Sequence, residues 1–352
     1  LEDIIATKTK IDFFGYTAAK ITPLMDAGMA DDISDLIKKY KIDMSKLEPT
    51  TVNAMTNITG GKIIGFPLKI ISGTLFYNKD LFDKFGVPYL TDTMTWDQVI
   101  GSARKLTRSE GGAQYYGLGI NPGQVLGTNS TLPPYVDAKT HQAQLTNDYW
   151  TKMFNRVLPL VSISDNVEAR NLMANYGKMW SMFNKDMTVA IAEANNSAYP
   201  QGATVWAMNW DIAQFPDFAD MPNVGPQPNP YYFFLSKNSP NRDAAFLAIS
   251  SLISDEMQLE LAKTGRAPAL KDRSFLKVLG SSDKNLKDKH TAGLVPKRYG
   301  EMATQDDYTA AATSALNTAF ADVVAGKKDV NTALRDATEA ANKKIETIIQ
   351  AK

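Results

Sequence analysis

Residues able to carry out acid–base, nucleophilic or metal chemistry are scarce in this chain. Its 352 residues include no cysteine and two histidines, His141 in a turn-rich segment and His290 in a charged one. Neither histidine has a partner nearby in the sequence, and no HExxH, GxSxG or calcium-loop motif occurs. Glycosidase carboxylates come from distant segments, but no pair of them stands out. We therefore expect no metal, no cofactor and no catalytic residue, with a glycan-active hydrolase or lyase kept as an alternative.

Glycine-rich segments that could cradle phosphate groups are incomplete. Gly117, Gly119 and Gly123 do not follow the GxGxxG spacing of a dinucleotide-binding loop. The Gly-Gly-Lys run at 60–62 lacks the upstream glycine and the downstream Ser or Thr of a P-loop. Lys plus Arg equals Asp plus Glu at 38 each, so there is no basic surplus for a nucleic acid. Nucleotide cofactors and nucleic-acid partners are not expected.

Length and composition favour a globular protein of about two domains. Hydrophobic residues make up 44% of the chain, which is ample for packed cores. No apolar run approaches the roughly 20 residues that a membrane-spanning helix needs. The lack of cysteine excludes disulfides, and it fits an exported bacterial protein as well as a cytosolic one. Because the chain opens on Leu1 without a signal peptide, we expect a mature or trimmed form.

The clearest local signals lie between residues 60 and 107. Apolar runs at 62–66 and 73–77 are bounded by Gly and Pro, which predicts two buried strands. A helix should then begin after Asn78 as its N-cap and end at Gly86. Thr95 and Gln98 stand three apart as a capping box, and apolar residues follow at helical spacing. This stretch therefore predicts strand, strand, helix, linker and helix.

Further elements are predicted along the rest of the chain. Strands are expected at residues 3–7, 115–121, 204–213 and 231–235. Helices are expected at residues 33–40, 147–160, from 239 onward, and at 254–263. A long amphipathic helix should close the chain, because an apolar stripe runs from Val330 to Ile348. Mixed strands and helices indicate an α/β protein.

The segment YNKDLFDKFGVPY followed by TWDQVIGSARKLT resembles the first-lobe signature of family 1 extracellular solute-binding proteins. These proteins are the capture subunits of bacterial ABC importers and are typified by the maltose-binding protein. The FDKFGVP form of the motif resembles the Gram-positive lipoprotein branch. Further similar segments follow in the expected order: NWDIAQFPDF, NVGPQ, LSKNSPNRDAAF, TGRAPAL and DVNTALRDATEAANKKIE.

The resemblance implies a periplasmic-binding-protein-like (type II) α/β fold, with two lobes built on mixed sheets and joined by hinge crossings. Lobe 1 is expected at residues 1–114 and 236–290, and lobe 2 at residues 115–235 and 291–352. By comparison with the family, the first strand and helix have no counterpart at the start of this sequence; either they lie outside this numbering, or lobe 1 is truncated and lacks a central strand. A lipid-bearing cysteine would precede that missing segment.

The resemblance also implies a function. We expect extracytoplasmic capture of a sugar or oligosaccharide in an interlobe cleft, hinge closure around it, and delivery to the membrane subunits of an ABC importer. A monomer is expected, lipid-anchored at a Gram-positive cell surface or periplasmic. Alternatives are a binder of a peptide, polyamine or anion, and a sensor or adhesin. A cleft lined by Lys and Arg would favour anions.

Residue by residue, the resemblance gives a set of ligand-binding candidates. They are Lys10, Asp12, Tyr16, Tyr77, Asn121, Trp180, Asn184, Tyr231, Tyr232, Arg266 and Tyr308. Residues 179–183 resemble the family's GKxAM strand, but the small residues and aromatic that usually follow are absent at 185–187. Trp180, Asn184, Lys185 or Asp186 are therefore expected to serve instead. Of Tyr231 and Tyr232, one should face the ligand, because neighbouring strand residues point to opposite sides.

Overall fold

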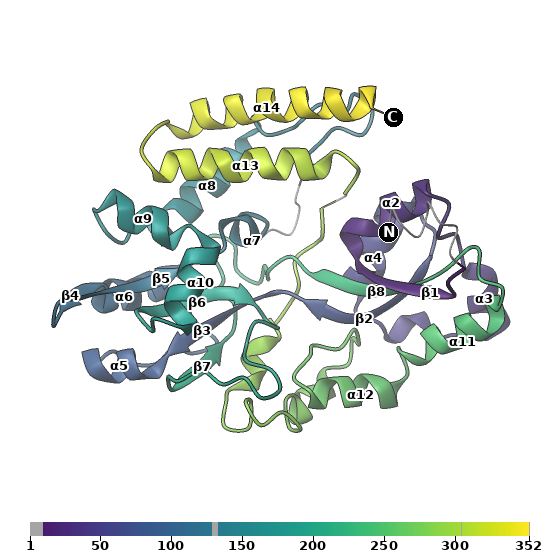
Figure 1. The fold of residues 1–352 in the computed structure, drawn as a ribbon, viewed down its shortest axis with the longest axis horizontal. Coiled ribbons are helices and arrows are strands. Elements are labelled where there is room, and N and C mark those ends of the chain that lie inside the picture. The colour runs from purple at the N-terminus through teal and green to yellow at the C-terminus, as the bar shows by residue number, and fades with distance from the viewer. Residues whose placement is uncertain (1–9, 129–132, 304, 352) are drawn as a thin grey trace. The chain divides into compact units, whose positions relative to one another are not determined.

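The computed structural model describes residues 10–128, 133–303 and 305–351. The described chain divides into two compact units (Figure 1). Unit 1 comprises the residues up to 71 together with 228–282 and 302–307, and unit 2 comprises 72–227, 283–301 and the residues from 308 onward. The chain passes between the units five times. The strand expected at residues 3–7 lies outside the described residues.

Unit 1 is built around a three-stranded antiparallel sheet of order β1-β8-β2. Its strands are β1 (Phe13–Thr17), β2 (Gly65–Ile71) and β8 (Asn229–Leu235). Its helices are η1 (Ala18–Lys20), α2 (Ile21–Asp26), α3 (Ser34–Lys39), η2 (Met44–Lys46), α4 (Pro49–Thr59), α11 (Arg242–Ser251), α12 (Asp255–Lys263) and η3 (Arg273–Val278).

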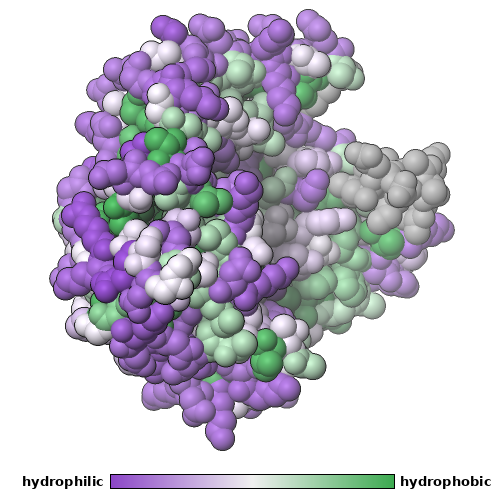
Figure 2. Space-filling model, turned by 60° about the vertical axis from the view of Figure 1, so that its left-hand side comes forward, coloured by the Kyte–Doolittle hydropathy of each residue, from purple (hydrophilic) through white to green (hydrophobic). Residues whose placement is uncertain are grey.

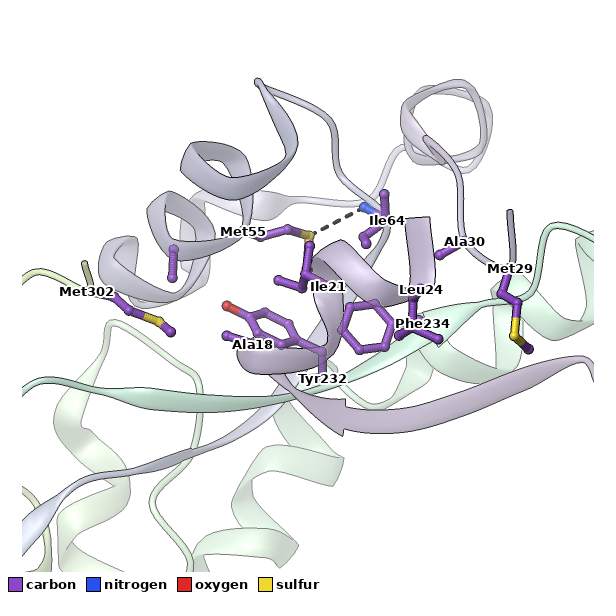
Figure 3. Packing of buried hydrophobic residues seen from close by; sticks show 11 residues of the cluster. Ala18, Ile21, Leu24, Met29, Ala30, Met55, Ile64, Tyr232, Phe234 and Met302 are labelled. Atoms are coloured by element: carbon purple, nitrogen blue, oxygen red, sulfur yellow. Dashed lines mark hydrogen bonds between the residues drawn. The ribbon is translucent and has the colours of Figure 1, made fainter. Parts of the chain in front are cut away.

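The two faces of this sheet pack against different helices. On one face, Tyr232 and Phe234 of β8 lie among Ile21 and Leu24 of α2 and Met55 of α4 (Figure 3). The backbone N–H of Ile64 also points at the Met55 sulfur, 3.3 Å away (Figure 3). On the other face, Phe66 and Leu235 pack with Phe246 of α11. Alternation along β8 therefore divides its side chains between two cores.

Unit 2 is built around a five-stranded sheet of order β4-β5-β6-β3-β7. Its strands are β3 (Gly73–Asn78), β4 (Arg108–Glu110), β5 (Ala113–Gly119), β6 (Val189–Asn195) and β7 (Trp210–Ala213). Strands β5 and β6 run parallel, and the other neighbouring pairs are antiparallel. The sheet is thus mixed, as predicted.

Helices surround the sheet of unit 2 (Figure 1). They are α5 (Lys79–Phe85), α6 (Trp96–Leu106), α7 (Pro122–Leu126), α8 (Asp148–Val161), α9 (Val167–Met173), α10 (Tyr176–Asn184), η4 (Thr291–Leu294), α13 (Thr309–Val324) and α14 (Val330–Gln350). Helices α13 and α14 lie side by side and pack on α8, where Phe320 meets Phe154 at 5.3 Å between ring centroids (Figure 1).

The helix signals between residues 78 and 107 are confirmed. The Asn78 side chain accepts a hydrogen bond from Asp80 N at 3.0 Å, and Gly86 ends α5 in the left-handed region with φ +64°. Thr95 and Gln98 form the predicted capping box at the start of α6. Trp96 and Leu106 are buried on its apolar face. Local hydrogen bonding and side-chain periodicity fix these two helices.

The predicted lobe boundaries are corrected by the structure. Residues 72–114, expected in lobe 1, belong to unit 2, and residues 228–235, expected in lobe 2, belong to unit 1. The reason is strand pairing: β3 hydrogen-bonds to β6 and β7, whereas β8 lies between β1 and β2. The YNKDL signature therefore belongs to unit 2.

Three predicted strands also differ from the structure. Residues 179–183 lie in helix α10, capped by the Asn175 side chain, and the strand β6 begins only at Val189. Trp180 and Phe183 recur at helical spacing and stack at 5.5 Å, which stabilises the helix. The strand expected at 204–213 is limited to Trp210–Ala213. Strand β2 begins at Gly65, later than predicted.

The surface is mostly polar on the face drawn in Figure 2, where hydrophobic residues are scattered. Large exposed hydrophobic side chains include Phe13 at 42% and Leu247 at 46%. Among the described helices, none combines the length and apolar character required to cross a membrane.

A pair of glycines tests the packing of α6 on β5. A Cβ on Gly117 would lie 1.9 Å from the Ala103 carbonyl oxygen, whereas a Cβ on Gly101 meets no atom within 4 Å. G117A should therefore destabilise the protein by about 2 kcal/mol or more through overpacking. G101A should stabilise it by roughly 0.5–1 kcal/mol, because alanine favours a helix interior. Urea denaturation measures both changes, and an unchanged midpoint for G117A would contradict this packing.

Candidate functional site

A cluster of polar side chains lies in unit 2 where β5 and β6 end. Asn121 directly follows β5, Glu193 and Asn195 lie at the end of β6, and Gln124 belongs to α7. The N–H of Asn121 donates to Glu193 Oε2 at 2.8 Å. Because β5 and β6 are parallel, their carboxyl ends meet at one edge of the sheet. This edge is where α/β proteins commonly bind ligands.

Gln124 connects the members of this cluster. With its amide oriented to satisfy its neighbours, its nitrogen donates to Glu193 Oε1 at 3.0 Å and to Asn195 Oδ1 at 3.2 Å. Its oxygen accepts from the N–H of Gly73 at 2.6 Å. A Cβ on Gly73 would lie 3.0 Å from Glu193 Oε1 and 2.6 Å from the Phe215 ring, so only glycine fits here. We call Gly73, Asn121, Gln124, Glu193 and Asn195 the polar cluster.

Glu193 is a carboxyl group without an exposed atom. It has 0% exposure, and burial raises its pKa to about 8, while the hydrogen bond from Asn121 lowers it in part. The side chain is therefore mainly protonated and neutral at pH 7. A neutral carboxylic acid can donate as well as accept a hydrogen bond.

Aromatic side chains gather near the polar cluster. Trp180 stacks on Tyr176 at 6.2 Å and 15°, and its ring also meets Phe183 and Trp206 at 5.5 Å. Tyr176 and Trp180 are half-buried, whereas Phe183 is fully buried. Burial raises the pKa of Tyr176, and the carboxyl of Glu193 is near enough to raise it further. Tyr176 and Trp180 thus provide a partly exposed aromatic surface beside neutral and amide hydrogen-bonding groups.

Two of the predicted ligand-binding tyrosines are core residues. Tyr232 has 0% exposure, donates from its hydroxyl to Thr51 O at 2.6 Å and lies in the core of unit 1 (Figure 3). Tyr77 is 3% exposed and packs against Phe82 at 5.2 Å. Burial raises the pKa of both hydroxyls. Neither ring offers a face to a ligand, because alternation and flanking aromatics direct both inward.

Tyr231 precedes Tyr232 in β8, so its side chain points to the opposite face of the sheet. It is half-buried, and its hydroxyl donates to the Gly15 carbonyl oxygen at 2.9 Å. Tyr16 is half-buried on the opposite face and packs against the core of Figure 3. Tyr231 therefore stays a candidate, and Tyr16 contributes mainly to packing.

The remaining candidates in unit 1 are polar. Asp12 accepts from Ser239 Oγ at 2.6 Å, so it ties β1 to the start of α11. Lys10 is exposed. Arg266 is half-buried and donates from Nη1 to Thr264 Oγ1 at 3.0 Å. Asp12 has a structural bond, whereas Lys10 and Arg266 remain candidates.

The remaining candidates in unit 2 lie on three helices. Asn121 precedes α7 and joins the polar cluster. Asn184 ends α10, and its side-chain amide donates to the Trp180 carbonyl oxygen. Tyr308 is the N-cap residue of α13 and packs on His141, with ring centroids 4.9 Å apart. The structure thus brings Asn121 and Trp180 toward one region and holds Asn184 at the end of the same helix as Trp180.

Sequence reasoning missed Glu193, Gln124, Asn195 and Tyr176. One signal was available, because Glu193 is the only charged residue of the apolar run VAIAEAN. A charge inside a buried strand is rare and marks a paired or functional group. His290 has no partner nearby in the sequence, as stated, and is exposed, but its Nε2 lies 2.6 Å from Oδ2 of the distant Asp92.

No group of three or more His, Cys, Asp or Glu side chains that could hold a metal ion occurs in the part of the chain that the structure describes.

Comparison with known proteins identifies relatives of the chain. The family model described as bacterial extracellular solute-binding protein matches residues 2–259. Among solved structures, a sugar transporter from Rhizobium etli in an open conformation is 23% identical with a TM-score of 0.71, covering 97% of this chain and 87% of that one.

Two further structures show the same likeness. An ABC substrate-binding protein from Listeria monocytogenes in complex with cycloalternan is 18% identical, with a TM-score of 0.68 and coverage of 98% and 88%. A cyclic alpha-maltosyl-1,6-maltose binding protein from Arthrobacter globiformis is 17% identical, with a TM-score of 0.72 and coverage of 98% and 87%. The fold is therefore of the periplasmic-binding-protein-like (type II) class, as predicted.

The buried carboxyl of Glu193 predicts a pH dependence of stability. Its folded-state pKa of about 8 lies above the ordinary value of 4.5, so the folded state holds the proton more tightly. The contribution of Glu193 to the free energy of unfolding is fully present below pH 4.5. It is lost as the pH rises to 8, by at most roughly 1.4 kcal/mol per pH unit.

In the neutral variant E193Q, the free energy of unfolding should no longer fall between pH 4.5 and 8. In the control E339Q, at an exposed position of α14, it should fall as in the parent protein. Urea denaturation at pH 5, 6.5 and 8 measures the free energy of unfolding. Equal pH dependence in E193Q and the parent protein would show that Glu193 is ionised in the folded state.

Proposed function

Because the chain belongs to the bacterial extracellular solute-binding protein family, we propose that it captures a sugar or oligosaccharide outside the cytoplasm for an ABC importer. One observation carries the choice of ligand class: the stacked pair Tyr176 and Trp180 lies near the polar cluster around Glu193 in unit 2. A sugar presents apolar C–H groups on its faces and hydroxyls at its edge, so it matches both parts.

The chemistry of the polar cluster supports a neutral, hydroxyl-rich ligand. Asn and Gln amides and a neutral carboxylic acid can each donate and accept, as sugar hydroxyls do. The aromatic rings supply apolar contact area with a defined face. The carbohydrate ligands of solved structures with this fold, such as mannobiose and cycloalternan, support the same class.

The proposal extends to how the protein works. It acts as a monomer without a cofactor and without catalysis, and it delivers its ligand to membrane subunits of the importer. Attachment to the cell surface by a lipid, which the sequence resemblance implies, is part of this proposal and is tested by fractionation of expressing cells. A peptide, polyamine or anion binder is the alternative, and product formation on incubation with glycans would favour an enzyme.

Calorimetry against a panel of neutral and acidic oligosaccharides, amines and peptides tests the ligand class. We expect heat with at least one saccharide and none with the amines or peptides. Y176A should weaken that binding about 10-fold by removing one stacking ring. Y89A, which removes another partly exposed tyrosine of unit 2, should leave it unchanged. The absence of binding heat with every saccharide would contradict the proposal, as would an affinity of Y176A equal to that of the parent protein.

Closure of the two units around the ligand stays a prediction of the sequence resemblance. A ligand favours a closed form only as far as it binds that form more tightly. A change from 1% to 99% closed requires roughly 5.5 kcal/mol of differential binding. Small-angle X-ray scattering should show a smaller radius of gyration at saturating ligand, and an unchanged radius would contradict closure.

A further inference from the structure

Helix α10 of unit 2 carries a stack of three aromatic rings. Tyr176, Trp180 and Phe183 recur at intervals of four and three residues, so their side chains lie on one face of the helix. Trp180 stacks on Phe183 with ring centroids 5.5 Å apart and an interplanar angle of 22°, and on Tyr176 at 6.2 Å and 15°. Three and four residues of an α-helix rise by roughly 4.5 and 6 Å, so these near-parallel rings follow one another along the helix axis. Trp180 therefore lies between the other two rings.

The middle ring of this stack is enclosed by its neighbours. One face of Trp180 is turned toward Phe183 and the other toward Tyr176. Trp206 meets the same ring edge-on at 5.5 Å and 72°, and Phe76 of β3 does so at 5.9 Å and 66°. A sugar ring stacks on an open aromatic face. Trp180 is poorly placed for such a contact, because both of its faces already have an aromatic neighbour.

Tyr176 is the end ring of the stack. It is the first residue of α10, and among the described residues Trp180 is the one aromatic ring that it meets. The side chain is half-buried, and its face away from Trp180 has no aromatic neighbour in the described chain. Its hydroxyl takes part in no hydrogen bond with the described residues, but Glu193 lies within electrostatic reach of it. Tyr176 thus offers a ring face and a hydroxyl beside the polar cluster.

We propose that the captured sugar stacks on Tyr176 and that Trp180 is a positioning residue, which holds the Tyr176 ring without touching the ligand. This inference rests on the proposed sugar-binding function and assigns the roles of the two rings within it. A side chain that is mobile in the free protein loses conformational freedom when a ligand packs on it. Stacking on Trp180 orders the Tyr176 ring before the ligand arrives, which favours affinity.

The assignment moves the ligand contact along α10. The sequence resemblance gave Trp180 as a ligand-binding residue, whereas the stack gives the contact to Tyr176, one helical turn nearer the N-terminus. The hydroxyl of Tyr176 can donate to or accept from a sugar hydroxyl, which the indole of Trp180, a donor only, cannot do. A single side chain then supplies both the apolar and the polar part of the contact.

The titration of Tyr176 tests the positioning role without any ligand. The NMR resonance of its Cζ, in protein with carbon-labelled tyrosine, is identified by its loss in Y176F and followed against pH. Burial raises the pKa of this hydroxyl, and Glu193 raises it further. W180L removes the ring that covers one face of Tyr176, so the pKa should fall below that of the parent protein. W180F keeps a flat ring and should keep the pKa close to the parent value.

F85L is the matched control. Phe85 is also half-buried in unit 2 and meets a tyrosine, Tyr115, with ring centroids 5.2 Å apart. Its replacement should change neither the pKa of Tyr176 nor the affinity for a saccharide. A pKa of Tyr176 that is the same in W180L and the parent protein would overturn the positioning role.

Calorimetry then separates contact from positioning. The probes are mannobiose, maltotriose and cycloalternan, each the ligand of a solved structure with this fold. With the probe that binds most tightly, Y176A should weaken binding about 10-fold and W180L roughly 3- to 10-fold. The variant with both changes should bind no more weakly than Y176A alone, because Trp180 acts through Tyr176. W180F should restore most of the affinity that W180L loses.

The parent protein gives a direct measurement, which stands even where W180L does not fold. In its complex with the same probe, protons of the sugar should show nuclear Overhauser contacts to the ring of Tyr176 and none to the ring of Trp180. Contacts to Trp180, or losses of affinity that add in the double variant, overturn the assignment while sugar capture stands. Absence of binding heat with all of the probes overturns both proposals.

Discussion

The organisation of unit 2 depends on a fully buried carboxyl group, beside which the described side chains place no cation. Glu193 has 0% exposure, and its oxygens meet the Asn121 N–H and the Gln124 amide. An ionised carboxylate in such a place would cost several kcal/mol. The protein holds the neutral acid, which is compatible with burial when its lone pairs have partners. β3, β5, β6 and α7 must therefore keep their relative positions, because each contributes a member of the polar cluster.

Glycine permits this close arrangement. Gly73 opens β3 directly after the chain enters unit 2, and a side chain there would collide with Phe215 and Glu193. Gly73 therefore lies both at the point where the chain enters unit 2 and against the side chains of the polar cluster. In unit 1, Gly15 has a related role, because it lets Tyr231 lie across β1. These two glycines, neither of which lies in a turn, each permit a close side-chain packing within their own unit.

Part of the structure followed from the sequence because it is determined locally. The caps of α5 and α6 and the family signature depend on residues close together in the chain. Lobe membership depends on strand pairing between distant segments, so residues 72–114 were placed in the wrong lobe. Residues 179–183 fit a strand by composition. A helix is favoured because Trp180 and Phe183 stand three residues apart and the Asn175 side chain caps the N-terminus of α10. Tyr232 and Tyr77 show that a matching position in a motif does not reveal which way a ring points.

The polar cluster and the stacked pair Tyr176 and Trp180, all in unit 2, give two requirements for a ligand: hydroxyls and a flat apolar ring face. A crystal structure of the protein with the tightest-binding saccharide tests the central claim most directly. The account predicts a sugar ring against Tyr176, hydroxyls hydrogen-bonded to Gln124 or Asn121, and Glu193 still buried and uncharged. A ligand that contacts neither Tyr176 nor the polar cluster would contradict it.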